Sequence, residues 1–466
     1  MNRILIAGTH SGCGKTTVTC ALLTALKNRG LCPSAFKCGP DYIDPMFHRR
    51  AIGVTSRNLD PFFCTAQQLK RRIAAQAGGI ALLEGAMGYY DGVGSEGRYS
   101  AYEVARITQT PVVLVIDTKG MYASAGAVLK GFREYKKPSG LRGVIFNNSS
   151  PLLYEGFRSL AEKIGIKPLG FLPTEAKAAI ESRHLGLVTA GEIAGIEEKL
   201  ALLGLLAGQY IDIDGLLALA ACAPALEAAL PEISTSEDAL PEAAAPYTRP
   251  PGPVRIAVAR DEAFCFLYEE NLELLTALGC EIAFFSPLSD TALPDGVSGL
   301  YLCGGYPELH LETLSGNSAM LQAINGAVRS GMPTIAECGG FLYLHDTLDG
   351  FPMAHVVHAG AARTEKLRRF GYVTLCAKAD NLLCAAGESI RAHEFHYYES
   401  ADCGAGFIAQ KPQSKRNWPC VHATPTLYAG FPHLYFDANP VLAENFVRKA
   451  LEYGVKNLIF AGGSLC

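Results

Sequence analysis

The stretch RILIAGTHSGCGKTT, residues 3–17, decides the fold of the first half of the chain. Its apolar start predicts a buried strand, and the helical spacing of apolar residues from Val18 to Leu26 predicts a helix that stops near Gly30. A glycine-rich loop joins the two and leaves backbone N–H groups free at the helix N-terminus, where they bind phosphate. This order predicts a parallel α/β domain with a phosphate site.

The loop has the residue types of a P-loop, in which a lysine reaches terminal phosphates and a hydroxyl ligates Mg²⁺. Five residues rather than four separate Gly8 from Gly14, so the common GxxxxGK[ST] spacing fails at Thr9. The loop instead resembles the longer one of dethiobiotin synthetase. We predict that ATP is bound by these loop residues and by one beyond the loop: Gly8, Thr9, Gly12, Gly14, Lys15, Thr16, Thr17 and Asn147.

Carboxylates lie near the ends of predicted strands that follow the loop. Glu84 ends ALLEG, Asp91 lies in AMGYYDG, and Asp41 and Asp44 lie in KCGPDYIDP. Such carboxylates beside a P-loop can hold Mg²⁺ directly or through water. We predict Thr16, Asp41 and Glu84 as metal ligands, and Asp44 and Asp91 as groups that orient metal or substrate. A solvated loop acid or a helix cap is the alternative for each carboxylate.

Other polar residues of the first half have two interpretations each. Asn147 ends the predicted strand LRGVIFNN, where it can read a nucleotide base or form a turn. Arg183 and His184 in ESRHLGL can meet a polycarboxylate substrate or cap a helix. His10 stands where the related partition ATPases have a second lysine, and this difference favours a synthetase over a switch ATPase.

The order of strand-like and helical patterns predicts two α/β domains joined by a linker. Residues 1–220 form a parallel-sheet domain, and a second α/β series covers residues 254–466. Between them, residues 221–253 are rich in Ala, Pro, Glu and Ser and are predicted to be the linker.

Composition narrows the class of protein. The 466 residues carry a formal net charge of −4, which argues against nucleic acid or an anionic membrane as the main partner. No signal peptide and no run of about 20 apolar residues is evident, so we expect a cytoplasmic protein. Its 15 cysteines are then expected to be reduced thiols, and no CxxC pair indicates structural zinc.

In the second domain, MPTIAECGGF at residues 332–341 predicts a nucleophile on a strand-to-helix turn. A short buried strand precedes Cys338, glycines permit a tight turn, and FLYLHDTL is predicted to continue as a helix. The helix N-terminus is expected to lower the pKa of the thiol and to bind an oxyanion. Gly304 and Gly305 in GLYLCGGYPE offer a second source of oxyanion N–H groups beside Gly339. A buried structural cysteine and simple turn glycines are the alternatives.

A nucleophilic cysteine needs a base, and the chain has 11 histidines. His433 in YAGFPHLYF follows an apolar segment late in the domain, whereas His393 and His396 lie in a predicted strand within RAHEFHYYE. These residues alone leave the choice open.

The motifs together resemble one family across essentially the whole chain. The motifs are GTHSGCGKTT, FKCGPDYIDP, NLDPFF, LLEGAMGYYDG, SRHLGL, YLCGGYPEL, AECGGFLYL, RAHEFHYY and FPHLYF. Their order and spacing are those of the cobyrinate a,c-diamide synthase family. The resemblance implies a dethiobiotin-synthetase-like P-loop domain fused to a class I glutamine amidotransferase domain. It implies Cys338 as the nucleophile and His433 as its base. Many triad glutaminases have a glutamate two residues after this histidine, and here that residue is Tyr435.

The resemblance also implies an activity. Members use ATP with Mg²⁺ and L-glutamine to amidate the a and c acetate carboxylates of the corrinoid cobyrinate. Nickel sirohydrochlorin and hydrogenobyrinate are alternative substrates. A P-loop switch with a non-catalytic glutaminase-like binding domain is the alternative of another class. Small molecules are therefore the expected partners, and the sequence also permits a homodimer.

Overall fold

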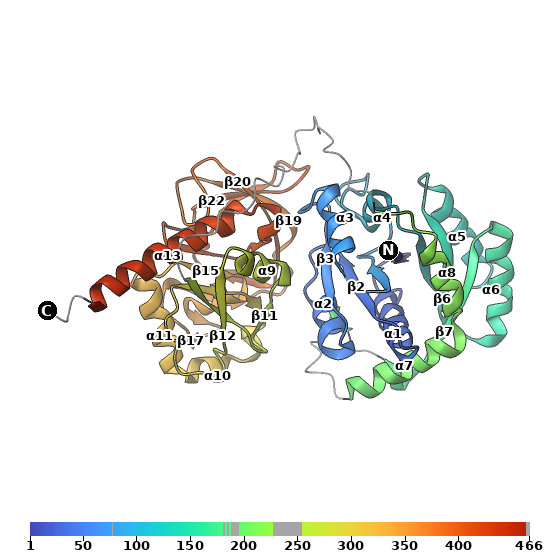
Figure 1. Ribbon diagram of the computed structural model, residues 1–466, viewed down its shortest axis with the longest axis horizontal. Helices are drawn as coiled ribbons and strands as arrows, with labels where there is room; N and C mark the ends of the chain where they lie inside the picture. Colours follow the sequence, from blue (N-terminus) through green and yellow to red (C-terminus); the bar gives the residue numbers. More distant parts are fainter. Residues whose placement is uncertain (77, 180–181, 184–185, 188–194, 227–253, 463–466) are drawn as a thin grey trace. The chain divides into compact units, whose positions relative to one another are not determined.

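The computed structural model describes residues 1–76, 78–179, 182–183, 186–187, 195–226 and 254–462 (Figure 1). The chain divides into two compact units, Met1–Glu237 and Asp238–Cys466. Of the predicted linker, residues 227–253 lie outside the described residues, and helix α8 (Ile213–Ala221) ends at the predicted boundary. Within the described ranges, no helix is long and apolar enough to cross a membrane.

The first unit is built on a parallel sheet, which confirms the prediction for this half. In the part of the chain that is described, its seven strands have the order β3-β2-β4-β1-β5-β6-β7. The strands are β1 (Asn2–Gly8), β2 (Pro33–Cys38), β3 (Ser56–Leu59), β4 (Ile80–Glu84), β5 (Val112–Asp117), β6 (Leu141–Ser149) and β7 (Lys167–Pro173).

Helices pack around this sheet, as Figure 1 shows. They are α1 (Lys15–Asn28), α2 (Ile43–Phe47), α3 (Ala66–Ala75), α4 (Ala101–Thr108), α5 (Ser124–Glu134), α6 (Pro151–Ile164), α7 (Ile196–Tyr210) and α8, and a π-helical turn η1 (His48–Ile52) follows α2. β1 lies between β4 and β5 and is buried from Arg3 to Gly8. Its carboxyl end therefore delivers the phosphate loop to the middle of the sheet edge.

The second unit has a mainly parallel sheet of its own. Its order is β12-β10-β13-β15-β25-β24 among the residues described, and only β24 runs antiparallel. The strands are β10 (Val254–Ala259), β12 (Cys280–Phe285), β13 (Gly299–Leu302), β15 (Thr334–Glu337), β24 (His422–Ala423) and β25 (Leu427–Gly430). The helices of this unit are α9 (Glu269–Ala277), α10 (Leu311–Gly316), α11 (Ser318–Arg329), α12 (Gly339–Tyr343) and α13 (Val441–Gly462).

Antiparallel strands complete the second unit, and the sequence anticipated only one of them, around residues 391–399. One sheet has the order β23-β22-β19-β20-β26, and a mixed sheet has the order β17-β16-β18-β21. Their bounds are β16 (His345–Leu348), β17 (Phe351–Pro352), β18 (Val357–Arg363), β19 (Arg369–Ala377), β20 (Ser389–His396), β21 (Tyr398–Ser400), β22 (Phe407–Gln410), β23 (Asn417–Cys420) and β26 (His433–Leu434), beside a short pair β11 (Phe264–Phe266) and β14 (Gly304–Gly305).

One local prediction is wrong. The helix after Cys338 ends at Tyr343, and residues 345–348 of the predicted helix form strand β16. β16 pairs with both β17 and β18, so tertiary pairing overrides the local helical pattern.

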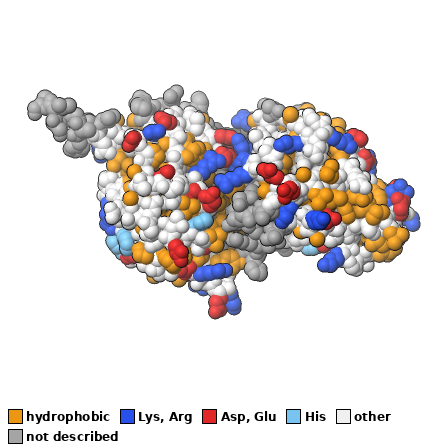
Figure 2. Space-filling view, turned by 90° about the horizontal axis from the view of Figure 1, so that it is seen from below, with side chains coloured by type: hydrophobic (Ala, Val, Ile, Leu, Met, Phe, Trp, Pro, Cys, Tyr) orange, Lys and Arg blue, Asp and Glu red, His pale blue; other side chains and the backbone are white. Residues whose placement is uncertain are grey.

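Charged side chains on the face shown in Figure 2 are mixed in sign. Over the described residues there, lysine and arginine occur in small groups among acidic side chains. A field of one sign, which would attract a polyanion over a wide surface, is therefore not built up on that face.

Candidate active sites

The phosphate loop of the first unit is held by Asn147. Gly14 has φ 93°, a left-handed conformation that favours glycine, and it precedes the first residue of α1. The Asn147 amide donates to the carbonyl of Cys13 at 3.1 Å, and a side-chain carbon at Gly14 would lie 2.0 Å from Asn147 Nδ2. Asn147 thus supports the loop backbone, a role that the sequence did not indicate, and its contact with a nucleotide base stays a prediction. Lys15 Nζ donates to the carbonyl of His10 at 3.1 Å, across the loop.

A buried cluster of charge lies beside the loop and is centred on Glu84, at the end of β4. Thr16 Oγ1 donates to Glu84 Oε1 at 2.6 Å, and Lys37 Nζ lies 2.9 Å from the same oxygen. His48 Nε2 is 3.2 Å from the other oxygen, Oε2. Burial alone would raise the pKa of Glu84, but Lys37 and His48 hold that pKa well below its usual range. Glu84 is therefore an ionised carboxylate in the core.

Asp44 joins this cluster from α2. Its carboxylate forms a close ion pair with Lys37, and its Oδ2 lies 3.4 Å from Thr16 Oγ1. Burial, with Asp41 adding to it, raises the pKa of Asp44. Burial alone would lower the pKa of Lys37, but Asp44 and Glu84 raise it well above the ordinary value. The ammonium group thus contacts both buried carboxyl groups, and it opposes the rise that burial gives the pKa of Asp44.

The donor set beside Thr16 fits a magnesium ion. Oxygens of Thr16, Asp44 and Glu84 converge, and hard oxygen ligands with net negative charge are what Mg²⁺ prefers. This set of oxygens has Asp44 where the predicted ligand set had Asp41. Asp41 Oδ1 accepts the backbone N–H groups of Ile43 and Asp44 at 2.8 and 3.1 Å, which is the role of a cap at the start of α2.

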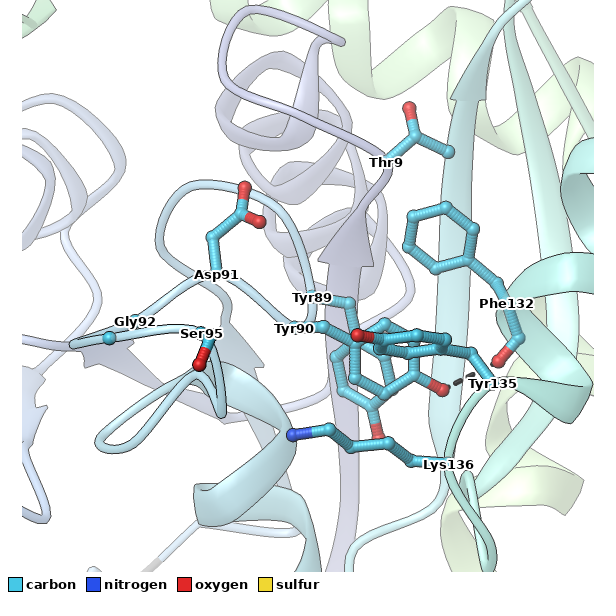
Figure 3. Close-up of a pocket in the computed structure, with 10 residues that line it drawn as sticks. Thr9, Tyr89, Tyr90, Asp91, Gly92, Ser95, Phe132, Tyr135 and Lys136 are labelled. Carbon is cyan, nitrogen blue, oxygen red and sulfur yellow. Dashed lines mark hydrogen bonds between the residues drawn. The ribbon is translucent and has the colours of Figure 1, made fainter.

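Asp91 lies at a turn, where its Oδ2 accepts the N–H of Gly88 at 2.9 Å. It lines a pocket of about 510 Å³ together with Thr9 of the phosphate loop, as Figure 3 shows. The rings of Tyr89, Tyr90, Phe132 and Tyr135 line the same pocket, with Lys136 beside them. Of the remaining predicted residues, Arg183 belongs to the short strand β8 (Ser182–Arg183), and His184 lies outside the described residues.

In the second unit, Cys338 occupies the predicted turn between β15 and α12. Its φ of 46° and ψ of −100° are unusual for a residue with a side chain, and its N–H donates to the Gly430 carbonyl at 2.8 Å. Strain of this kind is stored where the surrounding fold fixes it, and it is frequent at catalytic residues. The side chain is 6% exposed.

Glycines bring the predicted oxyanion donors and the predicted base together. A side-chain carbon at Gly339 would lie 2.9 Å from the nitrogen of Gly305, so the two predicted N–H donors adjoin. A side-chain carbon at Gly304 would lie 2.5 Å from Cε1 of His433. The β14 segment therefore contacts the turn after Cys338 on one side and the imidazole on the other. His393, the second candidate base, stacks on His433 with ring centroids 5.3 Å apart.

Burial sets the protonation of this site. It raises the pKa of the Cys338 thiol, so the expected lowering by the helix N-terminus is wrong for the site without substrate. The physical reason is desolvation of the thiolate, which a helix of five residues does not offset. Burial also lowers the pKa of His433 to about 3. At neutral pH the thiol and the imidazole are therefore both uncharged.

Comparison with known proteins matches both units to families. A model for a CobQ/CobB/MinD/ParA nucleotide binding domain covers residues 4–188, and one for a CobB/CobQ-like glutamine amidotransferase domain covers residues 255–441. The cobyrinate a,c-diamide synthase of Caldanaerobacter subterraneus subsp. tengcongensis is 36% identical over 97% of this chain and 99% of its own length. Proteins of the same name from Thermoplasma volcanium and Listeria monocytogenes serotype 4b are each 35% identical, over 98% and 94% of this chain and 99% and 97% of their own.

The chain belongs to the cobyrinate a,c-diamide synthase family. The resemblance drawn from the motifs is thereby confirmed, together with the pairing of a P-loop domain and a glutamine amidotransferase domain. The protein is accordingly a synthase with a glutamine amidotransferase domain, which agrees with the predicted C–N ligase class.

Sequence reasoning missed several residues of this synthase. Lys37 and His48 contact Glu84, and Glu337 contacts His433, although none was predicted. Lys37 lies in the motif FKCGPDYIDP, and Glu337 directly precedes Cys338, so both belong to segments that the sequence analysis used. A buried charged residue at the end of an apolar strand was the available signal.

We predict that Gly304→Ala lowers the glutamine-supported activity of this synthase by about 10²-fold. The new methyl group would displace the His433 ring. A displacement of about 1 Å at a catalytic group is enough for a loss of this size. Activity with free ammonia should be unchanged. The matched control is Gly316→Ala on exposed α10, where a side-chain carbon meets nothing within 4 Å. Equal glutamine-supported rates for the two variants would show that Gly304 does not adjoin the base.

Proposed function

We propose that this protein amidates the a and c acetate carboxylates of cobyrinate, with glutamine as nitrogen donor and ATP as the activating substrate. The observation that carries the proposal is the presence of two separate sites. One is a P-loop with a charged cluster. The other is a strained cysteine whose turn adjoins the β14 segment, which also contacts His433. Relatives that share nearly the whole chain bear the name of this activity.

In the second unit, glutamine acylates Cys338. The thiol proton passes to His433 as the sulfur attacks the carboxamide carbon, and the N–H groups of Gly305 and Gly339 hold the oxyanion. His433 then gives the proton to the leaving ammonia, and water hydrolyses the thioester. The uncharged resting thiol and imidazole suit this sequence, because the proton moves only when substrate is present.

In the first unit, ATP phosphorylates the acceptor carboxylate. Lys15 and the N–H groups of the loop bind the transferred phosphoryl group, and Lys37 supplies a further positive charge beside it. Thr16, Asp44 and Glu84 would hold Mg²⁺, which neutralises phosphate charge when it is bound. The acyl phosphate is then open to attack by ammonia, with inorganic phosphate as the leaving group. One ATP and one glutamine are consumed for each amide.

The substrate is tested by offering cobyrinate, hydrogenobyrinate and nickel sirohydrochlorin separately to the purified protein with ATP and glutamine. From cobyrinate, the proposal predicts a product in which two carboxylic acid groups have become carboxamides. Mass spectrometry detects it as a slightly lower mass, because NH₂ replaces OH at each position. Turnover of nickel sirohydrochlorin or hydrogenobyrinate alone would change the assigned substrate. ATP hydrolysis without any amide product would favour a P-loop switch, although His10 in place of a second lysine opposes that alternative.

We predict that Cys338→Ala abolishes glutamine-supported amidation and keeps amidation with free ammonia, because the nucleophile belongs to the nitrogen-releasing site alone. The measurement is the rate of product formation with each nitrogen source. Cys376→Ala is the control, since that thiol is exposed on β19. Retained glutamine-supported amidation in Cys338→Ala would refute the assigned nucleophile, and loss of both rates would indicate a structural role.

We predict the opposite pattern for Glu84→Gln. Removing the ionised carboxylate should lower amidation with either nitrogen source by on the order of 10²-fold, because the cluster beside Thr16 loses its charge. Hydrolysis of glutamine should persist. Glu155→Gln, on the exposed surface of α6, is the matched control. If Glu84→Gln had the Mg²⁺ requirement and the rate of the parent protein, Glu84 would not be a functional residue of the nucleotide site.

A further inference from the structure

The base of the proposed glutaminase has an unusual second neighbour. His433 lacks a carboxylate two residues later, because that position is Tyr435, whose buried ring packs edge-on against Tyr268 with centroids 4.7 Å apart. Glu337, the residue before Cys338, instead places its Oε2 3.5 Å from His433 Nδ1. The side chains of Glu337 and His433 are 1% and 2% exposed, so water does not screen the pair.

The two oxygens of Glu337 have different surroundings. Oε1 accepts the N–H of Leu434 at 3.1 Å and the hydroxyl of Tyr301 at 3.2 Å. Oε2 is buried and makes no hydrogen bond to any other described residue. Leaving such an oxygen unsatisfied costs free energy, which a protonated imidazole at Nδ1 would recover. The carboxylate is therefore fixed through one oxygen while the other is directed at the base.

A single asparagine positions both sides of this pair. Asn271, buried in α9, donates to the Tyr301 hydroxyl at 3.2 Å and to the Leu434 carbonyl at 3.0 Å, and its Oδ1 accepts the N–H of Phe436 at 2.9 Å. It thereby connects the tyrosine that holds Glu337 with the backbone that carries His433. A network of this kind fixes ring orientation without touching the reacting atoms.

We propose that Glu337 is the positioning residue of the glutaminase site, holding the proton of His433 on Nδ1 so that Nε2 accepts the thiol proton of Cys338. The inference rests on the proposed glutaminase function. It assigns to the residue before the nucleophile a task that many triad glutaminases give to a residue after the histidine. Glu337 touches neither glutamine nor sulfur, and it acts through His433.

The proton balance follows from this arrangement. As the sulfur bonds to the carboxamide carbon, its proton moves to Nε2 and the imidazole becomes positively charged, while the oxyanion gains the negative charge. The Glu337 carboxylate stabilises that imidazolium through Nδ1–H. When ammonia leaves, it takes the proton from Nε2 and the imidazole is neutral again. Nothing is oxidised or reduced.

The pH dependence has a defined direction. Burial raises the pKa of Glu337 to about 8, and its hydrogen bonds from Leu434 and Tyr301 act in the opposite direction. Among the described residues, the titratable groups that act on the pair include Tyr301, Tyr428, Cys303, Cys338, His393 and His396, and burial keeps each of them uncharged at neutral pH. The Leu434 amide donates to the carboxyl group as well. In the resting site the carboxyl group therefore ionises at mildly alkaline pH, so glutaminase kcat should rise from pH 6 to pH 8.

The test compares Glu337→Gln with the parent protein. A glutamine side chain keeps an acceptor for Leu434 and Tyr301 but turns an N–H toward His433 Nδ1, which leaves the proton on Nε2 and removes the base. We predict a fall in glutaminase kcat of about 10²-fold or more with an unchanged KM, and loss of the rise between pH 6 and pH 8. Glu337→Asp should recover part of kcat. Glu312→Gln, exposed on α10, is the control.

Two further measurements separate positioning from folding and from failure of the proposed function. Between about pH 4.5 and pH 8 the carboxyl group of Glu337 ionises in the unfolded chain but not in the folded one, so the folded state of the parent loses stability as pH rises. The uncharged side chain in Glu337→Gln avoids this loss. The Tm of the variant should therefore exceed that of the parent, by more at pH 8 than at pH 5. If Glu337→Gln had a lower Tm than the parent at both pH values, the role of Glu337 would be to stabilise the fold. The rate of Cys338 alkylation by iodoacetamide needs no glutaminase activity, and it should fall in Glu337→Gln across pH 6 to 8.

Identical alkylation curves for Glu337→Gln and the parent, or a glutaminase kcat within about threefold of the parent, would overturn the assignment. If the parent hydrolyses no glutamine but the alkylation rates still differ as predicted, the positioning role stands and the proposed glutaminase function fails.

Discussion

A buried carboxyl group at the carboxyl end of a parallel strand is the constraint on which both units depend. Glu84 is the last residue of β4 and Glu337 is the last residue of β15, and neither is exposed. A carboxylate in such a place must be compensated or neutralised, because desolvation disfavours its charge. The partners that the fold supplies therefore decide what each carboxylate can do.

The two units meet this constraint in different ways. Glu84 faces an ammonium and an imidazole, and their attraction overcomes desolvation, so the carboxylate stays ionised and ready for a cation. Glu337 faces a hydroxyl, a backbone amide and an uncharged imidazole, and desolvation prevails. A permanent negative charge suits the binding of a metal ion. In the proposed glutaminase site, Glu337 ionises at mildly alkaline pH, and its carboxylate then stabilises the imidazolium that forms as the sulfur attacks glutamine.

Local patterns in the sequence were sufficient for the elements that carry these sites. The strand, loop and helix around Lys15 and the strained turn at Cys338 depend on neighbouring residues, so periodicity and glycines predict them. The partners of Glu84 and His433 depend on register between distant strands: Lys37 opposes Glu84 across β2 and β4, and Glu337 opposes Gly430 across β15 and β25. No single-sequence pattern contains that register. The same limit explains why the antiparallel strands between residues 357 and 434 were largely missed.

The central claim is that the protein makes an acyl phosphate at the first site and attacks it with ammonia released at the second. The most direct measurement uses cobyrinate labelled with ¹⁸O in its acetate carboxylates, together with ATP and glutamine carrying ¹⁵N in the side-chain amide. The account predicts one ¹⁸O atom in the inorganic phosphate and one ¹⁵N atom in the product for each amide formed. Phosphate free of ¹⁸O, or product amides without ¹⁵N, would contradict it.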